Sequence, residues 1–155
     1  MKTVILNSDQ IARITKRIAL QIIETCYSEK SLLIGGIKPR GEWVAKEVIT
    51  HLSDISDIPY SYFDVDPYDI KIPEINFKDQ CVILVDDIVN SGNTMMKSAS
   101  MISLQDPKRL MTVCLVDRMH RKFPIMVDFT GLSLATTIQE HLSLKTGSKP
   151  EIILE

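Results

Sequence analysis

The segment from Cys81 to Val85 constrains the fold of this chain more than any other stretch of its sequence. Its residues, Cys-Val-Ile-Leu-Val, are continuously apolar, and two acids, Asp86 and Asp87, follow at once. An unbroken apolar run of this length is typical of a strand that is buried on both faces, as in the middle of a parallel sheet. The segment therefore predicts a central strand that ends in two carboxylates.

Helical and strand patterns alternate along the rest of the chain. Apolar residues recur at helical spacing after Asn7, which can form a capping box with Gln10, and they predict a helix over Ser8–Tyr27. The prolines of Asp66–Asp79 predict a loop there. The other predicted helices are Glu42–Leu52 and Ser91–Leu104, and the other predicted strands are Ser31–Ile37, Tyr60–Val65, Leu110–Val116 and a C-terminal hairpin of His141–Lys145 with Glu151–Leu154.

This alternation predicts an α/β fold with a mainly parallel central sheet, flanking helices and a small C-terminal hairpin. A length of 155 residues suits one domain, residues 1–155, and 45% apolar with 25% charged residues is ordinary for a globular protein. No apolar run approaches the roughly 20 residues that span a bilayer, and no secretory leader follows Met1. The three cysteines lie in apolar surroundings, which favours reduced thiols in a cytoplasmic protein.

The turn after the central strand has the residues of an anion site. Asn90, Ser91, Gly92, Asn93 and Thr94 lead from the acid pair into the next helix. Glycine lets a ligand approach the backbone closely, and free N–H groups at a helix N-terminus attract phosphate. The neighbouring carboxylates accept hydrogen bonds from the vicinal hydroxyls of a sugar. The segment therefore predicts a site for a phosphorylated ribose.

Two alternative roles for the acid pair fit the sequence less well. Response-regulator receiver domains carry such a pair after their first strand, with a phosphoacceptor Asp and a Lys later, whereas here the pair follows the third predicted strand. A purely structural pair is disfavoured because adjacent carboxylates repel each other unless a ligand, a metal or basic groups lie nearby.

Several motifs together resemble one family. Val82–Thr94 resembles the ribose-phosphate signature of type I phosphoribosyltransferases. Gly36–Gly41 is similar to the pyrophosphate-binding turn of the pyrimidine-operon attenuator family, whose members also act as uracil phosphoribosyltransferases. Leu115–Ile125 and Val127–Gly131 resemble later segments of the same family in the same order, so the resemblance extends from about Thr15 to Leu154.

The resemblance implies a type I phosphoribosyltransferase fold and an activity. Phosphoribose would pass from phosphoribosyl pyrophosphate (PRPP), bridged by Mg²⁺, to a nucleobase, with uracil the best guess, and pyrophosphate would leave. The implied catalytic residues are Asp86, Asp87 and Arg40, with Asp86 also facing the magnesium. The 5′-phosphate would be bound by Asn90, Ser91, Gly92, Asn93 and Thr94, and the pyrophosphate by Lys38, Pro39, Arg40 and Gly41. The base would be covered by Asp117 and Arg118, and the candidates for contacts to RNA or phosphate are His120 and Arg121.

The chain also departs from the family pattern. The loop Asp66–Asp79 is shorter than the substrate-covering loop of relatives, and Pro39 removes an N–H donor from the pyrophosphate turn. Asn90 stands where purine-using relatives carry a proton-accepting Asp. Met126 and Leu132 stand where attenuators carry basic residues.

These departures leave three functions open. An enzyme is the first. The second is a nucleotide-sensing regulator that binds RNA. The net charge of −2 gives no overall attraction to RNA, but a single basic patch would favour this function. That patch would comprise Lys108, Arg109, Arg118, Arg121 and Lys122. The third is a family member that binds nucleotide without efficient catalysis. RNA is the less favoured partner, and a homodimer or larger homo-oligomer would use the first helix or the surface around Phe123–Phe129.

Overall fold

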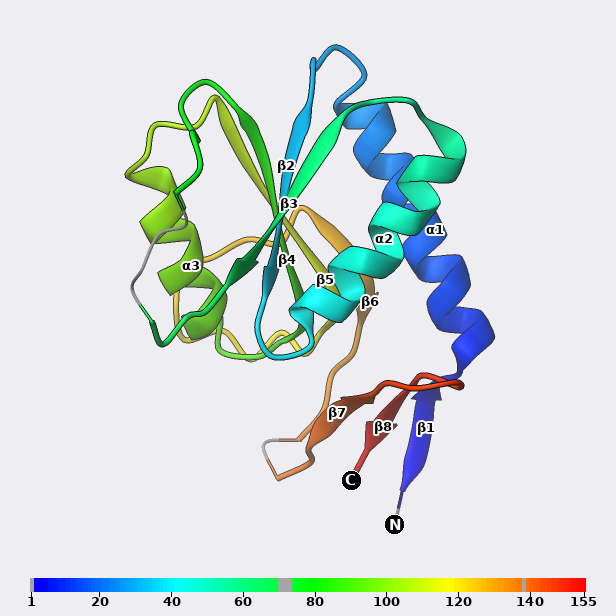
Figure 1. The fold of residues 1–155 in the computed structure, drawn as a ribbon. Helices are drawn as coiled ribbons and strands as arrows, with labels where there is room; N and C mark the ends of the chain where they lie inside the picture. Colours follow the sequence, from blue (N-terminus) through cyan, green and yellow to red (C-terminus); the bar gives the residue numbers. More distant parts are fainter. Residues whose placement is uncertain (1, 70–73, 138) are drawn as a thin grey trace.

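A computed structural model describes residues 2–69, 74–137 and 139–155. Along the chain, the strands and helices are β1 (Thr3–Leu6), α1 (Ser8–Thr25), β2 (Leu32–Ile37), α2 (Gly41–Ile55), β3 (Tyr60–Val65), β4 (Cys81–Val89), α3 (Asn93–Ser103), β5 (Arg109–Asp117), β6 (Phe129–Ser133), β7 (Leu142–Lys145) and β8 (Glu151–Leu154). The parallel sheet has the order β3-β2-β4-β5-β6 (Figure 1). The predicted α/β class is confirmed, with β4 at the centre of the sheet.

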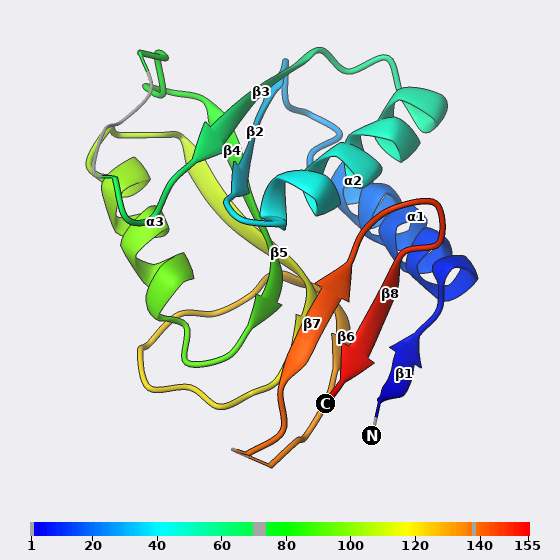
Figure 2. The same cartoon turned by 60° about the horizontal axis from the view of Figure 1, so that its bottom comes forward.

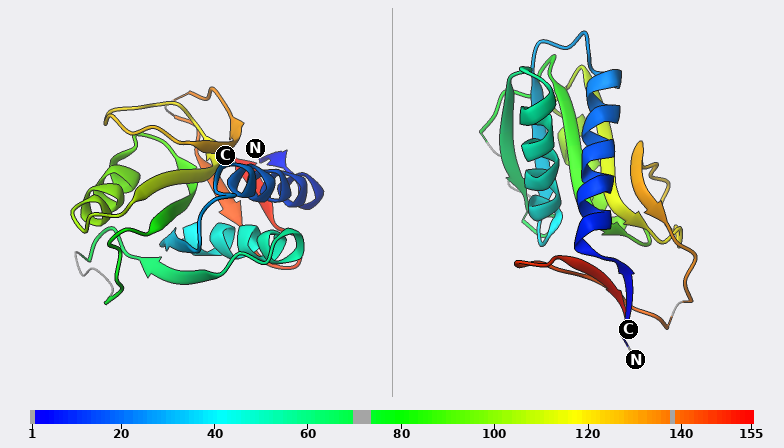
Figure 3. Two further views of the ribbon diagram at one scale, coloured as in Figure 1. Left: turned by 90° about the horizontal axis from the view of Figure 1, so that it is seen from above. Right: turned by 90° about the vertical axis from the view of Figure 1, so that its right-hand side faces the viewer.

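Helices cover both faces of this sheet, with α1 and α2 on one side and α3 on the other (Figure 3). Alternate residues of β4 enter different cores, because side chains along a strand point to opposite faces. Ile83 and Val85 pack in the cluster beneath α1 and α2, whereas Val82 and Leu84 pack in the cluster beneath α3. Burial on both faces is what the continuous apolar run predicts.

A second, antiparallel sheet of order β1-β8-β7 lies beyond the carboxyl ends of the parallel strands (Figure 2). We call this sheet the hood. The predicted hairpin forms β7 and β8, and β1 joins them although sequence patterns indicated no strand before α1. Helix α1 begins at the predicted capping box, in which Asn7 and Gln10 each accept the other's backbone N–H, at 2.9 and 2.8 Å. The hood therefore takes its third strand from the segment directly before this cap.

Three local predictions need correction. Strand β4 continues to Val89, so the acid pair lies inside the strand and not after it, and α3 begins at Asn93 and not at Ser91. Strand β6 was not expected; Phe129–Ser133 extends alongside β5. Residues 70–73 of the predicted loop lie outside the described residues.

The single basic patch does not form. Lys108 and Arg109 lie at the amino end of β5, and Arg118, Arg121 and Lys122 follow its carboxyl end. The nine-residue strand β5 runs from one group to the other, which is a distance of about 30 Å. Lys108 instead forms an ion pair with Glu29, at 3.0 Å.

Within the described residues, no helix combines the length and the apolarity that a membrane span requires.

Candidate functional site

The acid pair lies at the carboxyl end of β4 and divides two pockets. Because neighbouring residues of a strand point to opposite faces, Asp86 lines a pocket on the side of α3, and Asp87 lines another pocket on the side of Arg40 and the hood. Asp86 is only 6% exposed, and one of its carboxylate oxygens accepts the backbone N–H of Asp87 at 2.8 Å. A ligand that crosses the end of β4 therefore meets both carboxylates.

Both carboxyl groups are harder to ionise than an ordinary aspartate. Burial is the main cause that raises the pKa of Asp86, and the charge of Asp87 raises it further. Burial also raises the pKa of Asp87, against the opposing charge of Arg40. Among the described residues, no lysine or arginine forms an ion pair with either acid. Hydroxyl donors or a cation would relieve this unfavourable pair.

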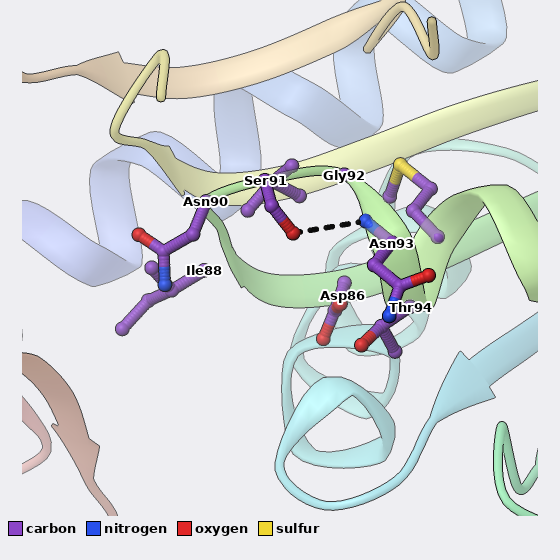
Figure 4. Close-up of a pocket in the computed structure, with 9 residues that line it drawn as sticks. Asp86, Ile88, Asn90, Ser91, Gly92, Asn93 and Thr94 are labelled. Atoms are coloured by element: carbon purple, nitrogen blue, oxygen red, sulfur yellow. Dashed lines mark hydrogen bonds between the residues drawn. The ribbon is translucent and has the colours of Figure 1, made fainter. Parts of the chain in front are cut away.

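The pocket beside Asp86 is an anion cradle formed by the turn that leads into α3 (Figure 4). The Ser91 hydroxyl oxygen accepts the backbone N–H of Asn93 at 3.2 Å, which closes the turn. Gly92 caps α3 at a φ of 85° without a side-chain hydrogen bond, and a Cβ there would lie 2.5 Å from Cγ2 of Ile125. The N-terminus of α3, with the positive end of the helix dipole, therefore lies at the pocket that Asn93 and Thr94 line.

The size of this pocket suits one small anionic group. Its volume is about 150 Å³, below the roughly 300 Å³ at which pockets for whole drug-sized ligands begin. The residues predicted to hold a 5′-phosphate, Asn90 to Thr94, all line it together with Asp86. The structure thus brings the predicted cradle and one of the acids into one cavity.

The predicted pyrophosphate turn lies on the other side of β4. The Lys38–Pro39 peptide bond is cis, and Arg40 has a φ of 75°, a left-handed conformation that non-glycine residues rarely adopt. Arg40 is exposed and precedes Gly41, the first residue of α2. Its side chain lines a pocket of about 340 Å³ together with Asp87 and Asn90. Lys38 is directed elsewhere, toward Asp64 on β3, at 3.3 Å.

The side chains that follow β5 contact the protein itself. Asp117 accepts two hydrogen bonds from the Arg121 guanidinium, at 3.0 and 2.8 Å, and Arg121 also donates to the Asn90 carbonyl at 3.1 Å. These hydrogen bonds fasten the segment after β5 to the turn that leads into α3. Arg121, a candidate for nucleic-acid contact, thus has its guanidinium engaged within the fold.

Arg118 and His120 hold the segment that leads from β6 to the hood. Arg118 is 6% exposed and donates to the Thr136 hydroxyl and to the carbonyls of Thr137 and Glu140, at 2.7 to 2.9 Å. His120 Nε2 donates to the Thr136 carbonyl at 2.7 Å. Arg118 and His120 therefore fasten the segment between β6 and the hood.

Sequence reasoning missed two sets of site residues. The hood contributes His141, Ser143 and Lys145 to the pocket beside Arg40, and Asp64 on β3 reaches Lys38. The C-terminal hairpin was expected, but nothing in its pattern indicates which of its faces turns toward β4. An acid one residue before the end of a parallel strand was an available signal for Asp64, because ligands bind at that edge.

A model of the phosphoribosyl transferase domain matches residues 2–145. The chain belongs to the phosphoribosyl transferase family. Two relatives, each named bifunctional protein PyrR, support this placement: the one from Streptococcus suis is 33% identical over 141 residues (84% of this chain, 82% of the relative), and the one from Deinococcus radiodurans is 32% identical over 160 residues (93% and 87%). The predicted family is therefore confirmed.

Solved phosphoribosyltransferases have the same fold. The HGPRT-ase of Leishmania tarentolae, in complex with GMP, aligns with a TM-score of 0.78 at 18% identity and covers 86% of this chain and 82% of its own. The hypoxanthine-guanine phosphoribosyltransferase of Bacillus anthracis aligns with a TM-score of 0.74 at 22% identity, covering 86% and 83%. At these identities the likeness confirms the phosphoribosyltransferase fold.

Proposed function

We propose that this phosphoribosyl transferase family member transfers the phosphoribosyl group of PRPP to uracil and releases pyrophosphate. The observation that carries the proposal is the placement of Asp86 and Asp87 between an anion cradle and the pocket of Arg40. The 5′-phosphate fits the cradle, the ribose hydroxyls reach the carboxylates, and the leaving group meets Arg40. The base would occupy the hood side of that same pocket, near His141 and Ser143.

In this arrangement, the bond from C1′ of the ribose to the pyrophosphate oxygen breaks, and a bond from C1′ to a ring nitrogen of the base forms. Positive charge develops on the ribose ring and negative charge on the leaving group. Arg40 stabilises the leaving group, and the two carboxylates orient the ring. Asn90 has no proton-accepting group, which supports a pyrimidine over the purines that Asp-bearing relatives use.

The residues present fit a magnesium ion bound through its substrate. Among the described residues, no three His, Cys, Asp or Glu side chains gather to enclose a metal. Mg²⁺ commonly binds through one or two carboxylates together with substrate phosphates, and it keeps several waters. The buried Asp86 carboxylate, which lacks a basic partner among the described residues, suits that role. When bound, the ion would neutralise charge on the pyrophosphate.

Pyrophosphate release tests the proposal directly. With PRPP, Mg²⁺ and each nucleobase in turn, we expect release to be fastest with uracil and to be slow, because the short loop Asp66–Asp79 shields the reacting ring poorly from water. PRPP should also raise the melting temperature, since it binds the native state. The proposal would be contradicted if no base gave pyrophosphate release and millimolar PRPP caused no thermal shift.

RNA binding is a second candidate, supported by the attenuator resemblance and by relatives named bifunctional. The division of the basic residues between the two ends of β5 argues against a strong RNA surface there. Each lost phosphate contact reduces the log–log salt slope by about 0.7 for single strands. We therefore expect weak binding at physiological salt, with no preference for a pyrimidine-operon leader over a scrambled hairpin. Tight, leader-specific gel shifts across a salt series would reverse this ranking.

We further propose that the protein works in the cytoplasm as a homodimer or a larger homo-oligomer. All three cysteines are free and buried, in keeping with a reducing compartment. Large apolar side chains are exposed at both surfaces considered for an interface, Leu20 on α1 and Phe123 with Met126 after β5.

A further inference from the structure

The Lys38 ammonium is held by β3 instead of facing the pocket of Arg40. Its nitrogen lies 3.3 Å from a carboxylate oxygen of Asp64, and both side chains are about half exposed. The backbone supports the pairing, because the Lys38 N–H donates to the Val65 carbonyl at 2.8 Å. Asp64 lies opposite Gly36 in the register of β2 and β3. The end of β3 therefore contacts the pyrophosphate turn directly.

Tyr62 orients the Asp64 carboxylate. Its hydroxyl donates to Oδ1 of Asp64 at 2.6 Å. This hydrogen bond is the main reason that the pKa of Asp64 lies below its usual value, so Asp64 is ionised at neutral pH. Burial, followed by the same hydrogen bond, raises the pKa of Tyr62, so the phenol remains a donor. Gly36 gives this hydroxyl room, since a Cβ there would lie 2.6 Å from it.

Two anions then compete for one ammonium group. The carboxylate of Asp64 is fixed in place and half exposed, so its ion pair with Lys38 is weak. Pyrophosphate, which carries more charge than one carboxylate, can displace it, but it must do so against the Asp64 carboxylate. This competition lowers the affinity of the turn for pyrophosphate, including the pyrophosphate released as product.

We propose that Asp64, oriented by Tyr62, is a positioning residue that holds the Lys38 ammonium between turnovers and competes with pyrophosphate for it. The inference rests on the proposed function, in which Lys38 belongs to the pyrophosphate turn. It assigns to β3 a part in product release.

The test measures the affinity of inorganic pyrophosphate, with Mg²⁺, for the Asp64→Asn variant. Because exposed ion pairs contribute up to about 1 kcal/mol, the variant should bind pyrophosphate roughly two- to fivefold more tightly. KM for PRPP should fall, and kcat should stay equal or decrease. Asp64→Glu should restore the original values. Asp57→Asn makes the same change of charge on an exposed residue before β3 and should have no effect.

A Lys38→Met background shows whether the effect acts through the ammonium. In that background, Asp64→Asn should no longer increase the affinity for pyrophosphate, because coupled residues lose their interaction when either one is removed. Two results would overturn this inference and leave the proposed function standing. One is unchanged or weaker pyrophosphate binding in Asp64→Asn, and the other is an equal gain in pyrophosphate affinity in the Lys38→Met background. An original protein that binds neither PRPP nor pyrophosphate would overturn the proposed function as well.

Discussion

Replacing Asp86 and Asp87 together with asparagine should abolish PRPP binding and leave a protein at least as stable as the original. Hydrogen bonds to charged groups contribute about 1.5–3 kcal/mol each, so losing two should weaken binding at least about 100-fold. The fold should not suffer, because both carboxyl groups have raised pKa values and their ionised forms are unfavourable when buried. Calorimetric titration with PRPP and denaturant unfolding measure the two effects.

The stability of the original protein and of this variant should depend differently on pH. Because both pKa values are raised in the folded protein, the native state takes up protons before the unfolded state as pH falls. The free energy of unfolding of the original protein should therefore rise as pH falls from above the folded pKa values toward the usual aspartate range, by about 1.4 kcal/mol per unit of pKa difference. The variant should lack this rise, so its stability advantage should shrink in acid.

A control with the same charge change is Asp54→Asn with Asp57→Asn, since both residues are exposed at the far end of α2. It should bind PRPP normally and show no comparable difference with pH. Unfolding of the Asp86–Asp87 variant at neutral pH would mean that the pair is structural. Normal PRPP affinity in that variant would remove the pair from the site.

Arg40→Gly should separate catalysis from stability at a single position. If Arg40 faces the leaving group as proposed, removing this charged donor should lower kcat on the order of 10²- to 10³-fold. Stability should stay equal or rise by up to about 1 kcal/mol. At a φ of 75°, arginine has the left-handed penalty that glycine avoids, while glycine adds entropy to the unfolded chain. Single-turnover kinetics and thermal unfolding test the two halves.

Asp106→Gly is the matched control for the backbone effect. Asp106 also has a positive φ, 54°, and lies in the turn before β5, away from the site. It should show a similar change in stability with full activity. Arg40→Lys keeps the charge but loses the planar fork, and it should have intermediate activity. Full activity in Arg40→Gly would remove Arg40 from the leaving-group site.

Local patterns in the sequence were sufficient to predict the central strand and a turn after it, but not where the strand ends or where α3 begins. The apolar run Cys81–Val85 and the turn Asn90–Thr94 are contiguous, so their conformations follow from neighbouring residues. The capping box of α1 is local in the same sense. The family resemblance also depended on such short, ordered motifs, and the domain match confirms it.

Only the tertiary structure determined how distant segments meet. Strand β5 separates basic residues that are close in sequence. Arg118 contacts the segment between β6 and the hood, 18 to 22 residues further along the chain. Asp64 joined Lys38 because β3 lies beside β2, and β1 joined β8 from the other end of the chain. Periodicity records which face of an element is buried, whereas the partner of an exposed charge depends on which strands pack side by side. That choice follows from the packing of the whole core and is not encoded in any one segment.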